Sequence, residues 1–160
     1  MIELARDLRD EGDELHAFLS SFAPDDWRRA TPFKNWTAED VLVHLMVGDW
    51  LNALSMTDPD RFVDIMARWM AARADGNKTS GAEYFDEPVS HGGELLSQWQ
   101  AGLNRLCDLF KDSDAKTRMK WVGPDMSIRS AATARLMETW AHGQEIYDLL
   151  RVTRQATDRI

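Results

Sequence analysis

The sequence predicts an all-α protein, a four-helix bundle with one short additional helix. Apolar residues recur every three or four positions in four long segments, which is the spacing of a helix with one buried face. Runs in which apolar and polar residues alternate, as in a half-buried strand, do not occur. With 160 residues, 44% of them hydrophobic, the chain has the length and apolar content of one compact domain.

The first two predicted helices differ in how clearly they begin. The first covers about residues 2–22 and shows only the helical spacing of its apolar residues. The second begins after Thr37, an N-cap residue, and Asp40 three positions later stands where a capping box has its acidic residue. Its apolar stripe consists of Val41, Leu42, Leu45, Leu51 and Leu54.

Three more helices complete the prediction. The short additional helix runs from about residue 59 to 74, because proline at position 59 fits the first turn of a helix. Residues 75–81 are polar and rich in glycine, which predicts a connecting loop. The next helix begins at residue 88 or 90 and ends at about 111. Ser127 caps the last long helix, which extends to about Leu150.

Charge and hydropathy narrow the range of partners. The formal net charge is −8, with 27 acidic and 19 basic residues, and the basic residues do not gather into a cluster. We therefore expect neither nucleic acid nor an anionic membrane as a partner. No apolar run approaches the roughly 20 residues that cross a bilayer, and the first residues lack the pattern of a signal peptide. The sequence predicts a cytoplasmic protein.

The cysteine content limits the chemistry of any metal site. Cys107 is the only cysteine, so the chain cannot form an internal disulfide or a cysteine-based zinc site. Its place on the apolar stripe of a predicted helix indicates a core residue. Any metal ion must therefore be bound by histidines and carboxylates.

Three residues have the chemistry of metal ligands. Glu138 and His142 are one turn apart in the last predicted helix, so both side chains lie on one helical face. His44 lies within or beside the stripe of the second helix, and Gly48 one turn later removes bulk where a cavity would need room. Asp40 could orient the His44 ring. Two histidines and one carboxylate leave a coordination position free, as in catalytic zinc or non-haem iron sites.

Each candidate ligand also has a purely structural interpretation. A Glu and a His one turn apart are common as a solvated pair, and a buried histidine is often only hydrogen-bonded within the core. From the residues alone, a helical bundle with structural His and Glu side chains is therefore an alternative. Such a bundle could form a homodimer through apolar faces, since the chain contains 7 Trp and 8 Met.

Two segments resemble a known family. Residues 36–45, WTAEDVLVHL, and residues 135–144, RLMETWAHGQ, are similar to the metal-binding domain of mycothiol-dependent maleylpyruvate isomerase, within the DinB-like superfamily of four-helix bundles. The resemblance implies a DinB-like metal-binding bundle over residues 1–151 and a tail or linker over residues 152–160. It also implies a divalent metal, usually zinc, bound by His44, Glu138 and His142.

The resemblance does not fix the reaction. The isomerase has a second, C-terminal domain that contributes to its substrate site, and 160 residues leave no room for one. Our leading hypothesis is a metal-dependent transferase or isomerase that uses a low-molecular-weight thiol such as mycothiol on a small electrophilic substrate. A metal with an open position can hold the thiol as a thiolate. A metal-dependent hydrolase and a non-catalytic metal-binding module are the alternatives.

Four further residues are candidates for the site. Arg135 could bind a substrate carboxylate, and Glu145 could orient a histidine ligand or transfer a proton. Trp50 and Trp140 could wall a pocket. Each has an ordinary alternative: a surface salt bridge for Arg135, a surface charge for Glu145 and core packing for the two tryptophans.

Overall fold

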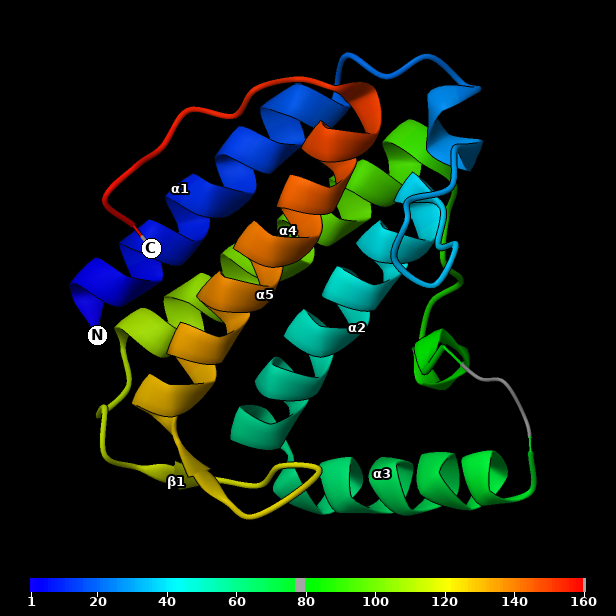
Figure 1. The fold of residues 1–160 in the computed structure, drawn as a ribbon. Helices are drawn as coiled ribbons and strands as arrows, with labels where there is room; N and C mark the ends of the chain where they lie inside the picture. The colour runs from blue at the N-terminus through cyan, green and yellow to red at the C-terminus, as the bar shows by residue number, and fades with distance from the viewer. Residues whose placement is uncertain (77–79, 160) are drawn as a thin grey trace.

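The computed structural model describes residues 1–76 and 80–159, which are predominantly helical (Figure 1). The prediction of an all-α fold is confirmed. Residues 77–79 of the predicted connecting loop lie outside the described residues. Within the described ranges, no helix is both long and apolar enough to cross a bilayer. The elements are α1 (Ile2–Leu19), η1 (Asp26–Arg28), α2 (Ala38–Thr57), α3 (Pro59–Ala74), η2 (Ala82–Tyr84), α4 (Gly92–Lys111), β1 (Arg118–Met119), β2 (Met126–Ser127) and α5 (Ile128–Leu150).

Four of the helices form the bundle. In Figure 1, α1, α2, α4 and α5 lie lengthwise beside one another, and both α1 and α2 pack against α4 and α5. The interior holds the largest fully buried side chains, including Trp99 and Phe110. Because α2 and α5 are neighbours, side chains far apart in the sequence can meet between them.

The helix α3 lies across one end of the bundle and extends beyond it (Figure 1). Its first residue is Pro59, and the side chain of Asp58 caps it by accepting a hydrogen bond from the Arg61 amide at 3.1 Å. A small apolar cluster, separate from the main core, joins α3 to α2. It consists of Val47, Leu51, Leu54, Phe62, Ile65 and Met66.

The helices α2 and α5 begin at the caps that the sequence predicts. Thr37 Oγ1 accepts from the Asp40 amide at 3.1 Å, and the Asp40 carboxylate accepts from the Thr37 amide at 2.9 Å, which completes a capping box. Ser127 accepts from the Ser130 amide at 3.1 Å. Among the described residues no hydrogen bond joins Asp40 to His44, so Asp40 serves the helix terminus and not the histidine ring.

A short antiparallel strand pair precedes α5. Arg118 lies opposite Ser127 and Met119 opposite Met126. Strands of two residues are too short to produce an alternating pattern, which is why the sequence did not indicate them. The loop between the strands carries Trp121, whose ring stacks on Phe62 of α3 with centroids 6.4 Å apart and planes at 15°.

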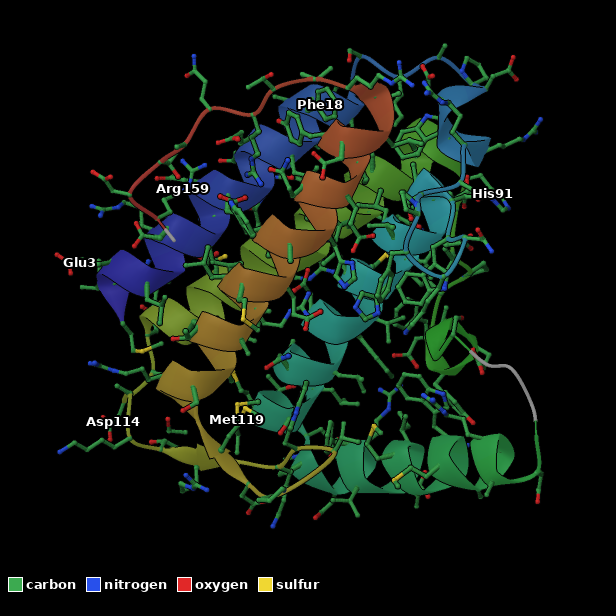
Figure 2. All side chains as sticks on the ribbon, in the orientation of Figure 1. Glu3, Phe18, His91, Asp114, Met119 and Arg159 are labelled. Atoms are coloured by element: carbon green, nitrogen blue, oxygen red, sulfur yellow. The ribbon has the colours of Figure 1, made fainter. Side chains whose placement is uncertain are left out.

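The predicted tail or linker runs back along α1 (Figure 1). Arg154 Nε donates to Glu14 at 2.8 Å, and Arg159 Nε donates to Glu11 at 3.0 Å. Arg154 also pairs with Glu11, and Arg159 with Glu14. Figure 2 shows Arg159 beside α1. The segment is thus fixed by an ion network, in which Glu11 is only 1% exposed.

Candidate metal centre

The three predicted ligands meet between α2 and α5. His44 extends from α2, whereas Glu138 and His142 lie one turn apart on α5. Glu138 Oε2 is 3.2 Å from His44 Nε2 and 3.3 Å from His142 Nε2. One donor atom from each residue lies within 4.8 Å of the other two. The fold therefore brings together the residues that the sequence singled out.

The spacing of these donor atoms fits a single divalent ion. Nitrogen and oxygen ligands lie about 2.0–2.1 Å from zinc, so neighbouring ligands in a tetrahedron are about 3.3 Å apart. The two contacts of Glu138, at 3.2 and 3.3 Å, agree with that value. In the part of the chain that the structure describes, three protein donors converge here. A fourth tetrahedral position would remain for a water molecule or a substrate.

The imidazoles also set the charge state of Glu138. His142 and His44, as hydrogen-bonding neighbours, hold the pKa of the Glu138 carboxyl well below its usual range, although partial burial acts in the opposite direction. Arg135 lowers this pKa further through its charge. The side chain is therefore an ionised carboxylate at neutral pH, which is the form that binds a metal ion.

Glu145 lies beside the second ring nitrogen of His142. Its Oε1 is 3.1 Å from His142 Nδ1, while Nε2 of the same ring faces Glu138. The two atoms are close but lack the alignment of a hydrogen bond. A carboxylate that accepts a hydrogen bond from this nitrogen of a histidine ligand would orient the ring and fix its tautomer, and Glu145 lies within reach of that role. Of the roles predicted for Glu145, the geometry favours this one.

Two aromatic side chains that the sequence analysis did not assign to the site cover the imidazoles. The Trp36 ring lies 5.1 Å from that of His44 and 6.0 Å from that of His142, measured between centroids. The Phe33 ring lies 5.6 Å from that of His142. These rings shield one side of the candidate ligands from water.

A tight turn holds both aromatic residues over the site. The Trp36 amide donates to the Phe33 carbonyl at 3.0 Å. Lys34 and Asn35 between them have φ values of 53° and 56°, as in a type I′ turn. Asparagine adopts this conformation readily and was the one local signal of such a turn. No local pattern indicates that the turn folds over α2 and α5.

Arg135 is buried and held by an acidic residue that sequence reasoning missed. Its Nε donates to Asp49 Oδ1 at 2.9 Å, and its Nη2 donates to the Leu45 carbonyl at 3.2 Å. The other carboxylate oxygen of Asp49 accepts from the Trp99 indole at 3.0 Å. With Arg135 5% and Asp49 2% exposed, this is a buried ion pair and not a surface salt bridge. No local pattern distinguishes Asp49 from a solvated helix residue.

Gly48 gives the guanidinium its space. A Cβ atom at this position would lie 2.5 Å from Arg135 Nη1. Among the described residues, Nη1 makes no hydrogen bond, whereas Nε and Nη2 are both engaged. The missing side chain of Gly48 therefore allows Arg135 to pack against α2, with Nη1 free of hydrogen bonds to the described residues.

A cavity of about 500 Å³ adjoins the candidate ligands. His44, Arg135 and Glu138 belong to its lining, and the rest is largely apolar. Apolar side chains reach it from α2, α3, α5 and the loop between β1 and β2. They include Val47, Leu51, Met66, Trp69, Trp121 and Met126.

The structure does not bring the two predicted pocket tryptophans to this cavity. Trp50 packs against Phe85, with ring centroids 4.8 Å apart, and lines a second cavity that contains none of the three candidate ligands. Trp140 is 38% exposed and lines neither cavity. The tryptophans that line the first cavity are Trp69 and Trp121.

The fold and the site together define a class of protein: a helical bundle with a His–Glu–His cluster at the edge of an apolar cavity. The chain belongs to the mycothiol maleylpyruvate isomerase N-terminal domain family, whose model matches residues 8–147. This confirms the resemblance carried by the segments around His44 and Glu138.

Two relatives extend the comparison to nearly the full length of this chain. Two Mycobacterium tuberculosis proteins described as uncharacterised, one from each of two strains, are 36% identical to this chain over 154 residues. The alignments cover 96% of this chain and 59% of each relative. The chain thus spans about three-fifths of the length of the curated relatives it matches. No solved structure matches it.

Proposed function

We propose that this protein binds a divalent metal ion, zinc in the first instance, through His44, Glu138 and His142, and uses it with a low-molecular-weight thiol such as mycothiol. The reaction would be thiol transfer to a small electrophile or its isomerisation. The observation that carries the proposal is the convergence of three ligand atoms beside a cavity. Membership of a family named for a mycothiol-dependent isomerase supports the choice of thiol.

The thiol must come from outside the protein. Cys107 is buried, and burial raises the pKa of its thiol to about 12, so it is not a thiolate at neutral pH. A zinc ion in the site would lower the pKa of a bound external thiol and so keep it deprotonated.

Neither the transfer nor the isomerisation requires an oxidant or a reductant. The thiol sulfur donates an electron pair to an electrophilic carbon, and a carbon–sulfur bond forms. In a transfer, the leaving group departs with the electrons of the bond that breaks. In an isomerisation, the electrons of the substrate bond that opens pass to a carbonyl oxygen of the substrate. They return to that bond when the carbon–sulfur bond breaks and the thiol is released.

The residues around the candidate ligands have complementary roles. The free Nη1 of Arg135 can donate to a substrate oxygen on which negative charge develops, and Asp49 fixes its position. Phe33 and Trp36 cover one side of the imidazoles. Glu145 limits rotation of the His142 ring.

The deciding experiment is metal analysis of the purified, untagged protein beside two histidine variants. We expect one equivalent of zinc per chain in the wild type and its loss in His44→Ala. The matched control is His91→Ala, because His91 is a surface residue that pairs with Glu39 at 2.6 Å. Equal metal content in both variants would overturn the assignment of the ligands.

A titration of the cobalt-substituted protein with mycothiol tests the second half of the proposal. Coordination of sulfur should produce a charge-transfer band that His44→Ala does not show. Metal binding without a thiol response would indicate a metal-dependent hydrolase or a non-catalytic metal-binding module. Absence of metal after reconstitution would mean that the three side chains only stabilise the bundle.

A further inference from the structure

We propose that the cavity beside the candidate ligands binds the body of the substrate, and that this body is a flat, largely apolar ring system with a neutral or anionic oxygen substituent. The inference rests on the proposed function, in which a thiol attacks an electrophile at the metal centre. It adds the chemical class of that electrophile, which the ligand set alone does not determine.

The size of the cavity sets the size of the ligand. Its volume of about 500 Å³ lies within the range of small-molecule sites. An apolar cavity of about 150 Å³ holds one benzene ring. The space here is roughly three times larger, which suits two fused or linked rings with a substituent.

The walls suit a flat apolar body. Trp69 and Trp121 offer aromatic surfaces, and methionine thioethers adapt their shape to aromatic ligands. Met70 and Val122 also line the cavity although they are 56% and 47% exposed, so its mouth presents apolar surface to solvent. Exposed apolar groups around a cavity are typical of a ligand-binding groove. The methionines of the lining are Met66, Met70 and Met126.

The charges of the lining restrict the polar substituent. Arg73 and Arg135 both line the cavity, and Glu138, the one carboxylate among the lining residues, is a candidate metal ligand. Two guanidinium groups against one carboxylate give the lining a net positive charge, so a neutral oxygen or an anion is favoured over an amine. Asn52 Oδ1 and Trp69 Nε1 are buried without a partner among the described residues. A hydroxyl group on the ligand could donate to Asn52 Oδ1 or accept from Trp69 Nε1, whereas a carbonyl or carboxylate oxygen could accept only from Trp69 Nε1.

A second cavity supplies an internal comparison. It has a similar volume of about 540 Å³ and also contains aromatic residues, Trp50, Phe85 and Trp99. Its lining includes Asp86 and Glu87 and none of the candidate metal ligands. A ring compound that bound merely to any apolar hollow of this protein would enter this cavity as well.

Three naphthalene probes of nearly equal size test the proposal: 2-naphthol, 2-naphthoate and 2-naphthylmethylamine. Each is titrated calorimetrically into the metal-free, untagged full chain, so that the carboxylate cannot bind through zinc. We expect one molecule of naphthol or naphthoate per chain, and an affinity at least tenfold lower for the amine. Equal affinity for all three probes would overturn the predicted substituent.

A matched pair of variants locates the bound probe. Ala134 of α5 lines the first cavity, and Ala101 of α4 lines the second. Ala134→Phe should lower the affinity for 2-naphthol at least tenfold, and Ala101→Phe should leave it unchanged. The reverse result, or binding that neither substitution weakens, would refute the proposal.

Two further measurements keep the result interpretable. Met70→Glu alters an exposed side chain at the mouth of the cavity and does not endanger folding. It should lower the affinity for naphthoate at least threefold more than the affinity for naphthol.

Zinc content is measured separately on the wild type. Zinc without probe binding would refute this inference and leave the proposed function intact. Probe binding without zinc would refute the proposed function and leave the cavity as a ring-binding site.

Discussion

Two clusters of ionisable side chains, the candidate metal ligands and the network that holds the tail, differ in how fully their members satisfy one another. In the tail network, Glu11 and Glu14 each pair with both Arg154 and Arg159, so two negative charges meet two positive ones. In the metal cluster, two histidines face a single carboxylate beside a cavity.

The difference separates a cluster that is saturated by its own members from one that could accept a ligand. A balanced and fully paired network has no capacity left for a ligand, and its effect is to fix chain segments against each other. Donor atoms that converge on one point next to open space retain that capacity. The Arg135–Asp49 pair combines both properties, because it is buried and paired, yet Arg135 lines the cavity and its Nη1 makes no hydrogen bond to the described residues.

The largest expected effect comes from breaking the tail network. Glu11→Ala leaves the buried Arg154 and the partly buried Arg159 with one carboxylate instead of two. Because Glu14 still pairs with both, we expect a loss of about 3 kcal/mol, the lower end of the cost of losing a buried ionic partner. Urea unfolding should show this loss, while zinc content stays at the wild-type value. Glu3→Ala is the control, since Glu3 of α1 points away from the bundle in Figure 2. A stable variant, or one that loses zinc, would contradict the separation of the two clusters.

Removal of metal should affect the other cluster alone. A ligand that binds only the folded state at a hundredfold excess over its Kd stabilises it by about 2.7 kcal/mol. Zinc should therefore raise the unfolding temperature of the wild type, and a chelator should reverse the change. His142→Ala should show no response to zinc, whereas Glu11→Ala should keep it. A zinc response in His142→Ala would mean that the ion binds elsewhere.

The parts of the site that could be predicted from the sequence are those set by local spacing. The helical repeat places Glu138 and His142 on one face, and the cap at Thr37 fixes the start of the helix that carries His44. The resemblance to a known family then joined the three residues into one site. The fold class followed in the same way, from repeats that lie within single segments.

The unpredicted parts depend on contacts between distant segments. The turn that carries Phe33 and Trp36 could be recognised as a loop, but its position over α5 is a property of the tertiary structure. The spacing of residues along a helix also does not reveal which neighbouring segment each face will meet. The sequence therefore could not predict that Trp50 lines the second cavity and Trp121 the first. Asp49 illustrates the same limit, since only its contact with Arg135 reveals its role.

A smaller effect is expected from Gly48→Ala, which tests whether Arg135 is held as firmly as the tail. Alanine favours a helix over glycine by roughly 0.5–1 kcal/mol. The added Cβ would lie 2.5 Å from Nη1, and displacement of packed atoms costs about 1–3 kcal/mol. We expect a net destabilisation of about 1 kcal/mol. In the control Gly102→Ala, the added Cβ would lie 3.8 Å from Arg105 Nη2, an ordinary van der Waals contact, so this substitution should be stabilising. Stabilisation by both substitutions would indicate a loosely held guanidinium.

The smallest effect concerns the pH dependence of the tail network. Burial acts to raise the pKa of Glu14, but the hydrogen bonds and charges of Arg154 and Arg159 outweigh it, so this pKa is lowered on folding. The corresponding stabilisation is present above the unfolded pKa of about 4.3 and is lost as the pH falls through the lower, folded value.

Glu14→Gln isolates that contribution. Because the Glu14 side chain is 29% exposed and screened by solvent, the variant should be less stable than the wild type by about 1 kcal/mol at pH 7. Urea unfolding at pH 7, 5 and 3 should show that difference shrinking as Glu14 becomes protonated in the wild type. A difference independent of pH would mean that Glu14 stabilises the tail through packing and neutral hydrogen bonds, and the contrast with the metal cluster would then rest on Glu11 alone.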